Sequence, residues 1–247
     1  MKIVFLGTNG WYDTQTGNTL SALIETNEAY IVLDAGNGIF KLDKYAIHQK
    51  PIYLFLSHFH LDHVSGLHIL SKFDFCQGLK ILGEAGTRRI LNTLVNDPFT
   101  IPLGQLKYKT EVYELPEEQA TLPFKVVSLP LNHSSMCLGF RFQIENKVVS
   151  YCTDTGYCEN AETLATDADL LIAECSLKSG QDDKVWPHLN PAAAAMMARA
   201  SKAKRLALTH FDANVYTTLE DRIEAEREAS KIFVNTFAAF DDMVVEI

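Results

Sequence analysis

The chain has 247 residues, of which 47% are hydrophobic and 21% are charged, and its formal net charge at pH 7 is −9. This composition is that of an ordinary globular protein and excludes a disordered chain. The acidic balance argues against a protein that grips long nucleic acids by neutralising their phosphates, because such binding needs a basic surface.

Three features bear on where the protein works. The apolar run at residues 3–6 is too short for a signal peptide, and no run approaches the ~20 residues that span a membrane. The five cysteines form an odd set without a C-x-x-C pair, which argues against a disulfide framework. We therefore expect a cytoplasmic protein with no membrane contact.

Short strands and helices alternate along the chain. Strands are predicted at residues 3–6, 20–25, 30–34, 52–56 and 79–83, and helices at 39–45, 62–72 and 85–95. The second half predicts strands at 111–114, 124–129, 139–145, 148–152, 170–173, 205–209 and 243–247, and helices at 192–200 and 219–234. Hairpin-like connections predict that the sheet in the first half is mixed or antiparallel. Without a repeat or linker, one domain over residues 1–247 is expected.

The densest cluster of reactive side chains follows the strand at 52–56, in the segment Ser-His-Phe-His-Leu-Asp-His at 57–63. His58 and His60 share a face of extended backbone, so both can reach one ion. Asp62 and His63 fall where a helical pattern begins and point elsewhere, which predicts a second ion. The weaker interpretation is an exposed loop with Asp62 as a helix N-cap.

Four more polar residues stand where apolar strands end: His133, Asp154, Glu174 and His210. Strand ends converge on one rim of a sheet, which is where open α/β proteins bind their ligands. Taken singly, each residue is weak evidence. Together with the first cluster, five imidazoles and two carboxylates suffice for two metal ions and a bridging carboxylate.

The segment from His58 to His63, followed by His133, by Asp154 in Thr-Asp-Thr-Gly and by His210 in Leu-Thr-His-Phe, resembles the metallo-β-lactamase superfamily. Within it, the closest resemblance is to the group around tRNase Z and related phosphodiesterases. The resemblance covers essentially the whole chain. It implies an α/β protein built as a four-layer αββα sandwich with metals at one edge.

The resemblance also assigns roles. The implied metal ligands are His58, His60 and His133 for the first ion, Asp62, His63 and His210 for the second, and Asp154 as the bridge. Asp34 either orients the ligand loop or merely caps a strand. The implied cofactors are two divalent ions, zinc or alternatively manganese or iron.

Glu174 and His188 resemble a pair of the tRNase Z group, in which a glutamate after a buried strand hydrogen-bonds a histidine before the next helix. Held protonated by Glu174, His188 would protonate a departing alkoxide. The alternative for His188 is an exposed loop histidine. The candidate catalytic residues are thus Asp62, Glu174 and His188.

An alkoxide leaves poorly without a proton, so this pair favours a phosphodiesterase. The leading prediction is a binuclear metal-dependent hydrolase that cleaves a small phosphodiester, such as a cyclic nucleotide or cyclic sugar phosphate, by attack of a metal-bound hydroxide. A tRNase Z-like RNA 3′-end endonuclease ranks second, because the interval between His133 and Asp154 has room for one hairpin but not for a tRNA-gripping arm. A metal-binding or regulatory protein without turnover ranks third.

The expected partner is the small phosphodiester, without extensive nucleic-acid binding, and the resemblance alone suggests a homodimer. Five aromatic residues near the motifs could stack on a base: Trp11, Phe59, Tyr157, Trp186 and Phe211. For Trp11, covering an edge of the core is the favoured interpretation.

Overall fold

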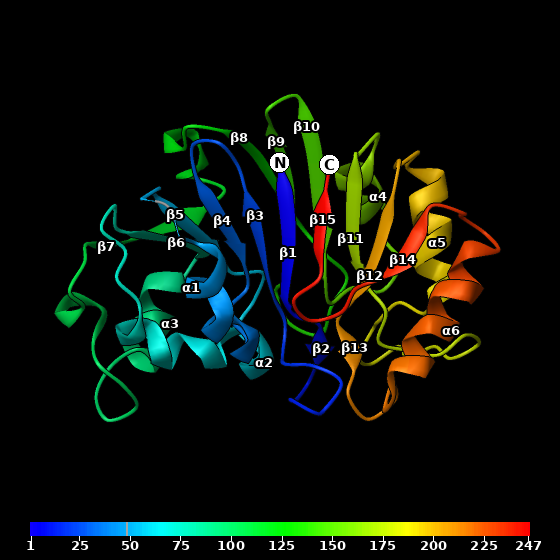
Figure 1. The fold of residues 1–247 in the computed structure, drawn as a ribbon, viewed down its shortest axis with the longest axis horizontal. Coiled ribbons are helices and arrows are strands. Elements are labelled where there is room, and N and C mark those ends of the chain that lie inside the picture. The colour runs from blue at the N-terminus through cyan, green and yellow to red at the C-terminus, as the bar shows by residue number, and fades with distance from the viewer. Residues whose placement is uncertain (48) are drawn as a thin grey trace.

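Two β-sheets pack face to face and carry helices on their outer sides (Figure 1). This arrangement is seen in a computed structural model that describes residues 1–47 and 49–247. Helices α1 to α3 cover the first sheet and α4 to α6 cover the second, as Figure 1 shows. The predicted four-layer αββα sandwich is confirmed.

The first sheet has seven strands in the order β15-β1-β3-β4-β5-β6-β7. Their bounds are Lys2–Gly7 for β1, Ser21–Glu25 for β3, Tyr30–Leu33 for β4, Ile52–Phe55 for β5, Leu79–Glu84 for β6, Thr110–Leu115 for β7 and Val244–Glu246 for β15. Strands β15, β1, β3 and β4 pair antiparallel, whereas β4 to β7 run parallel. The mixed sheet predicted for the first half is therefore confirmed.

The second sheet has six strands in the order β14-β12-β11-β10-β9-β8. Their bounds are Lys125–Pro130 for β8, Leu138–Ile144 for β9, Lys147–Cys152 for β10, Leu170–Glu174 for β11, Leu206–Thr209 for β12 and Thr236–Ala238 for β14. A separate parallel pair joins β2 (Asn9–Gly10) to β13 (Phe211–Asp212) at the lower centre of Figure 1. Strands as short as β2, β13 and β14 carry no periodic pattern, so the sequence does not predict them.

The α-helices are α1 (Leu42–Tyr45), α2 (Leu61–Val64), α3 (Thr87–Leu94), α4 (Glu159–Ala165), α5 (Pro191–Ala200) and α6 (Leu219–Ser230). The described residues also form four 3₁₀ helices: η1 (Asn37–Lys41), η2 (Ser65–Lys72), η3 (Leu103–Gln105) and η4 (Gln119–Thr121). Within the described residues, none of these helices is both long and apolar enough to cross a membrane.

Three helix predictions were wrong in extent or type, and one helix was missed. The helix predicted at 39–45 is η1 followed by one α turn, α1. The helix predicted at 62–72 is one α turn followed by η2, because the Gly66 N–H donates to the Ala35 carbonyl at 2.8 Å, and the Ala35 N–H donates to the His63 carbonyl at 2.8 Å. The helix predicted to end at residue 234 stops at Ser230, since the chain must turn into β14. Helix α4 was not predicted.

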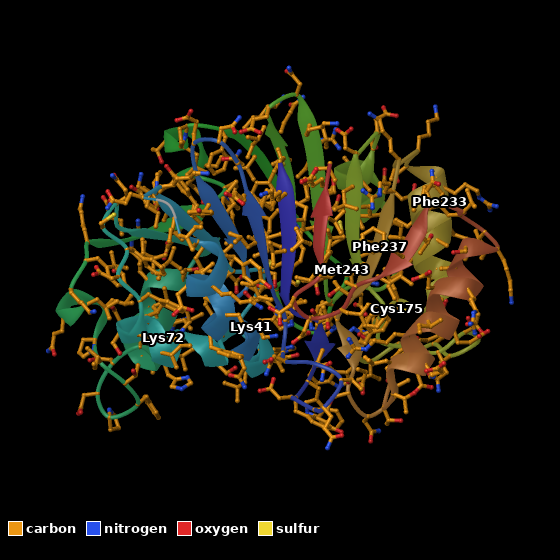
Figure 2. All side chains as sticks on the ribbon, viewed as in Figure 1. Lys41, Lys72, Cys175, Phe233, Phe237 and Met243 are labelled. Carbon is orange, nitrogen blue, oxygen red and sulfur yellow. The ribbon has the colours of Figure 1, made fainter. Side chains whose placement is uncertain are left out.

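The space between the sheets is filled by aromatic rings. The Phe55 ring on β5 lies 5.3 Å from that of Phe140 and 4.9 Å from that of Phe142, both on β9 of the other sheet. Phe237 and Met243, labelled in Figure 2, pack against the same core. Phe55 is the last residue of β5, so the segment at 57–63 starts just after a tightly packed strand end.

Candidate metal centre

The seven predicted ligands meet at one edge of the sandwich. They follow strands β5, β8, β10 and β12 in the chain. The structure brings them together as two sets with Asp154 between the sets.

The first set consists of His58, His60 and His133, which offer ligand atoms within 4.8 Å of one another. His133 Nε2 lies 3.2 Å from His60 Nδ1. His58 Nδ1 lies 3.0 Å from Ser57 Oγ, whereas His58 Nε2 is buried and has no hydrogen-bond partner among the described residues. Burial, reinforced by the charge of nearby His63, lowers the pKa of His58 well below its ordinary value. A neutral, unpartnered buried imidazole nitrogen suits a metal ion.

The second set consists of Asp62, His63 and His210, again with ligand atoms within 4.8 Å of one another. His210 Nε2 lies 3.3 Å from Asp62 Oδ2 and 3.1 Å from His63 Nε2. Ser176 Oγ lies 3.0 Å from His210 Nδ1 on the other side of the ring. With each Nδ1 engaged elsewhere, the Nε2 atoms of both histidines face the same point.

Asp154 lies between the two sets and directs one oxygen at each. Its Oδ2 is 3.0 Å from His63 Nε2 and 3.3 Å from His210 Nε2, while its Oδ1 is 3.9 Å from His133 Nε2. Its backbone is left-handed, with φ of 51°, as is that of His210 with φ of 51° and that of Asp34 with φ of 56°. Such conformations are uncommon outside glycine, although aspartate and histidine adopt them more readily than most residues, and they cluster at functional sites.

Asp34 contacts the ligand segment at residues 57–63 through its carboxylate. Its Oδ1 accepts the Ser57 N–H at 2.7 Å. Its Oδ2 accepts the Ser57 hydroxyl at 2.8 Å and the Tyr151 hydroxyl at 2.7 Å, and lies 2.9 Å from His63 Nδ1. Of the two interpretations left open for Asp34, these contacts favour the one in which it orients the ligand loop, through His63 and Ser57.

The charges of the site favour a cation. Burial alone would lower the pKa of His63, but the carboxylates of Asp154, Asp62 and Asp34 outweigh it and raise that pKa well above its ordinary value. Burial would raise the pKa of Asp154, yet the charges of His210 and His63 hold it well below its usual range. Anionic carboxylates this deeply buried require positive charge beside them.

Glu174 and His188 form the predicted pair. Glu174 is buried at the end of β11, and its two carboxylate oxygens lie 2.8 and 3.0 Å from His188 Nδ1. Burial tends to lower the pKa of His188, but the charge of Glu174 and its hydrogen bond raise it to about 9. His188 also has a ligand-capable atom within 4.8 Å of atoms of His133 and Asp154. Because Nδ1 is engaged by Glu174 and Nε2 has no hydrogen-bond partner among the described residues, Nε2 is the atom that can contact a bound molecule.

A cavity of about 830 Å³, the metal cavity, opens over the two sets. Trp11 and Trp186, which are 64% and 50% exposed, line it, and the Trp186 ring lies 5.4 Å from that of His60. The prediction that Trp11 covers the core was therefore wrong. No lysine or arginine lines this cavity within the described part of the chain.

The other three aromatic candidates lie elsewhere. Phe211 is buried with its ring 4.9 Å from that of Tyr216, so its predicted access to a ligand was wrong. Phe59 packs against the core of the first sheet, and Tyr157 lines a second cavity. An apolar side chain after a strand gives no sequence signal for the direction it faces.

Two supporting contacts were not predicted. The Trp11 N–H donates to Asp62 Oδ2 at 2.7 Å, which ties the loop after β1 to the second set. Arg222 is fully buried in α6 and donates to the Thr8 hydroxyl at 2.8 Å, holding the start of that loop. An arginine in a highly charged helix gives no hint of burial, so sequence alone could not have found it.

The chain is similar to known proteins along most of its length. A family model described as a beta-lactamase superfamily domain matches residues 29–211. The probable metallo-hydrolase YhfI of Bacillus subtilis (strain 168) is 27% identical over 217 residues, which cover 85% of this chain and 87% of that protein. A Ribonuclease Z of Bacillus cereus (strain B4264) is 24% identical over 306 aligned positions, with coverage of 98% and 97%.

Solved structures agree on the fold. The crystal structure of YhfI from Bacillus subtilis superposes with a TM-score of 0.81 at 23% identity and covers 100% of this chain and 98% of that one. A diphosphatase from the PhnP family superposes with a TM-score of 0.75 at 15% identity, with coverage of 100% and 97%. At these identities the likeness shows the fold alone.

Proposed function

The chain belongs to the β-lactamase superfamily, and from this membership we propose that it is a metal-dependent hydrolase that cleaves small phosphodiesters. The relatives named metallo-hydrolase and Ribonuclease Z support hydrolysis in general. The narrower choice of substrate depends on the residues of this chain.

The two ligand sets fit two divalent ions, with His58, His60 and His133 in one set and Asp62, His63 and His210 in the other. The unpartnered His58 Nε2 and the placement of the two Asp154 oxygens, one toward each set, support this assignment. Bound divalent ions polarise phosphoryl oxygens and make water nucleophilic at neutral pH. Zinc, manganese and iron all suit histidine and carboxylate ligands.

The observation that carries the phosphodiester assignment is the Glu174–His188 pair. Glu174 engages His188 Nδ1 through both of its oxygens, so the ring is fixed, Nε2 is left to a substrate, and His188 lines the metal cavity. A proton held there can be delivered to the oxygen of a departing alcohol. Hydrolysis of an ester with a good leaving group needs no such donor, so the pair indicates a substrate with a poor one.

The shape and charge of the site favour a small substrate. Strands β9 and β10 fill the interval between His133 and Asp154 as a single hairpin. The alignment with Ribonuclease Z spans 306 positions, so that protein carries segments that this chain of 247 residues lacks. The metal cavity also offers no lysine or arginine to a long polyanion within the described residues. A tRNase Z-like endonuclease is the second candidate, favoured by the similarity to Ribonuclease Z.

A hydrolysis panel tests the proposal. The protein, loaded with zinc or manganese, is assayed on bis(p-nitrophenyl) phosphate, cyclic nucleotides, dinucleotides and precursor tRNA. We expect hydrolysis of the small diesters and little or none of the tRNA. Preferred cleavage of precursor tRNA would favour the endonuclease. The absence of turnover on every substrate would favour a metal-binding or regulatory protein.

A further inference from the structure

A second cavity of about 410 Å³ adjoins the metal cavity at His188. The two cavities share only His188 and Asp183, and none of the seven candidate ligands lines the second one. Its volume falls in the range of small-molecule sites. His188 therefore lies at the boundary between a cavity that contains the ligand sets and one that does not.

The two cavities differ in chemistry. Asn132, Gln181, Asp182, Asp183, Lys184 and Asn190 give the second cavity many polar side chains, next to Tyr157, Pro187 and Leu189. Among the described residues, the side chains of Asn132 and Lys184 make no hydrogen bond or ion pair, so their donors are available to a ligand. Gln181 uses its Oε1 to accept the Lys178 N–H, which leaves its amide nitrogen available.

By contrast, apolar side chains stand beside the ligand sets in the metal cavity. Trp11, Leu61 and Trp186 line it and are all exposed, with Leu61 at 71%. A molecule that spans both cavities thus meets unengaged amide and ammonium donors on one side of His188, and two exposed tryptophans and a leucine on the other. The polarity of each half of a substrate would then decide which cavity it enters.

The geometry of phosphoryl transfer places the leaving group on the His188 side of the metal cavity, where the second cavity adjoins it. In an in-line displacement the leaving oxygen departs on the side of phosphorus opposite to the attacking water. That oxygen must lie beside His188 Nε2, because Nδ1 is held by Glu174. The group attached to that oxygen then lies next to His188, where the second cavity is open to it.

Given the proposed function, we propose that the second cavity binds the alcohol that is released, and that this alcohol is polyhydroxylated, as a ribose or glycerol unit is. Water adds to phosphorus, and the bond from phosphorus to the alcohol oxygen breaks with its electron pair on that oxygen. His188 gives its proton to this oxygen, and the proton that water loses passes to solvent. The arm that stays on phosphorus lies against Trp11 and Trp186.

The direction of cleavage of a mixed diester tests this assignment. Uridine 5′-(benzyl phosphate) carries two primary alcohols, one polyhydroxylated and one aromatic. We expect uridine and benzyl phosphate to exceed uridine 5′-phosphate and benzyl alcohol by tenfold or more, as measured by liquid chromatography. An equal mixture, or a majority of benzyl alcohol, overturns the assignment.

A matched pair of variants in α5 adds a second readout. Ala193 lines the second cavity, whereas Ala192, its neighbour in the same helix, lines neither cavity. We expect Ala193→Leu to raise KM for the mixed diester at least tenfold and to shift its products toward benzyl alcohol, while Ala192→Leu changes neither. Equal behaviour of the two variants contradicts the assignment.

Bis(p-nitrophenyl) phosphate distinguishes a failure of the cavity assignment from a failure of the proposed function. Its hydrolysis by the wild type, together with the wrong products from the mixed diester or none, overturns the assignment of the cavity and leaves the proposed function standing. Failure to hydrolyse either diester contradicts both.

Discussion

Replacement of His188 by alanine removes the proton donor of the proposed reaction and leaves the ligand sets in place. General acid catalysis contributes about 10²- to 10⁴-fold to a rate, which corresponds to about 3 to 5.5 kcal/mol of the activation free energy. The Nδ1 atom of His188 is held by both oxygens of Glu174, so its Nε2 is well fixed and the upper half of this range applies to an alkyl leaving group. A p-nitrophenolate leaves without a proton, so we expect a loss below about tenfold there.

The assay compares kcat for a dinucleotide and for bis(p-nitrophenyl) phosphate in the wild type and in His188→Ala, with the metal content of both measured. His68→Ala serves as the matched control, because His68 is exposed and lies outside both cavities. Equal losses on the two substrates at unchanged metal content would refute the role of His188 as the general acid. Loss of metal would show instead that His188 supports the ligand sets.

Three other predictions concern the support of the site and of the fold. Asp34→Ala should weaken metal binding about 10- to 100-fold in a chelator competition, because His63 loses the partner of its Nδ1; unchanged affinity would argue against this role. Phe55→Ala should cost about 3–5 kcal/mol of unfolding free energy in urea titrations, since it opens a void between the sheets; a cost below about 1 kcal/mol would contradict tight packing there. Asp221→Asn should lower the thermal midpoint at pH 7 and progressively less as the pH falls from 4 to 2, because the hydrogen bonds from Lys178 and Thr218 lower the pKa of Asp221 to about 2 and their stabilisation is lost on protonation; an effect independent of pH would contradict this.

The composition of the site could be predicted from sequence for a simple geometric reason. His58 and His60 share one face of extended backbone, and His133, Asp154 and His210 each follow an apolar strand. Both patterns involve residues that are neighbours along the chain, so they can be recognised in the sequence. The structure brings these residues together as expected, although their binding of metal remains a prediction.

What the sequence could not show depends on long-range contacts. The left-handed backbone of Asp154 and His210 could not be predicted, because aspartate and histidine adopt it more often than most residues but only at a small fraction of positions. The parallel pair β2–β13 has two residues per strand, yet it brings the loop with Trp11 against the site. Likewise, the 3₁₀ geometry after α2 is imposed by hydrogen bonds to Ala35, far away along the chain.

The metal content of the purified protein tests the central claim most directly. Elemental analysis of the wild type should give about two divalent ions per chain. Asp154→Ala, which removes the carboxylate placed between both ligand sets, should retain fewer than one. A folded wild-type protein that binds no divalent ion when supplied with zinc, manganese or iron would contradict the account.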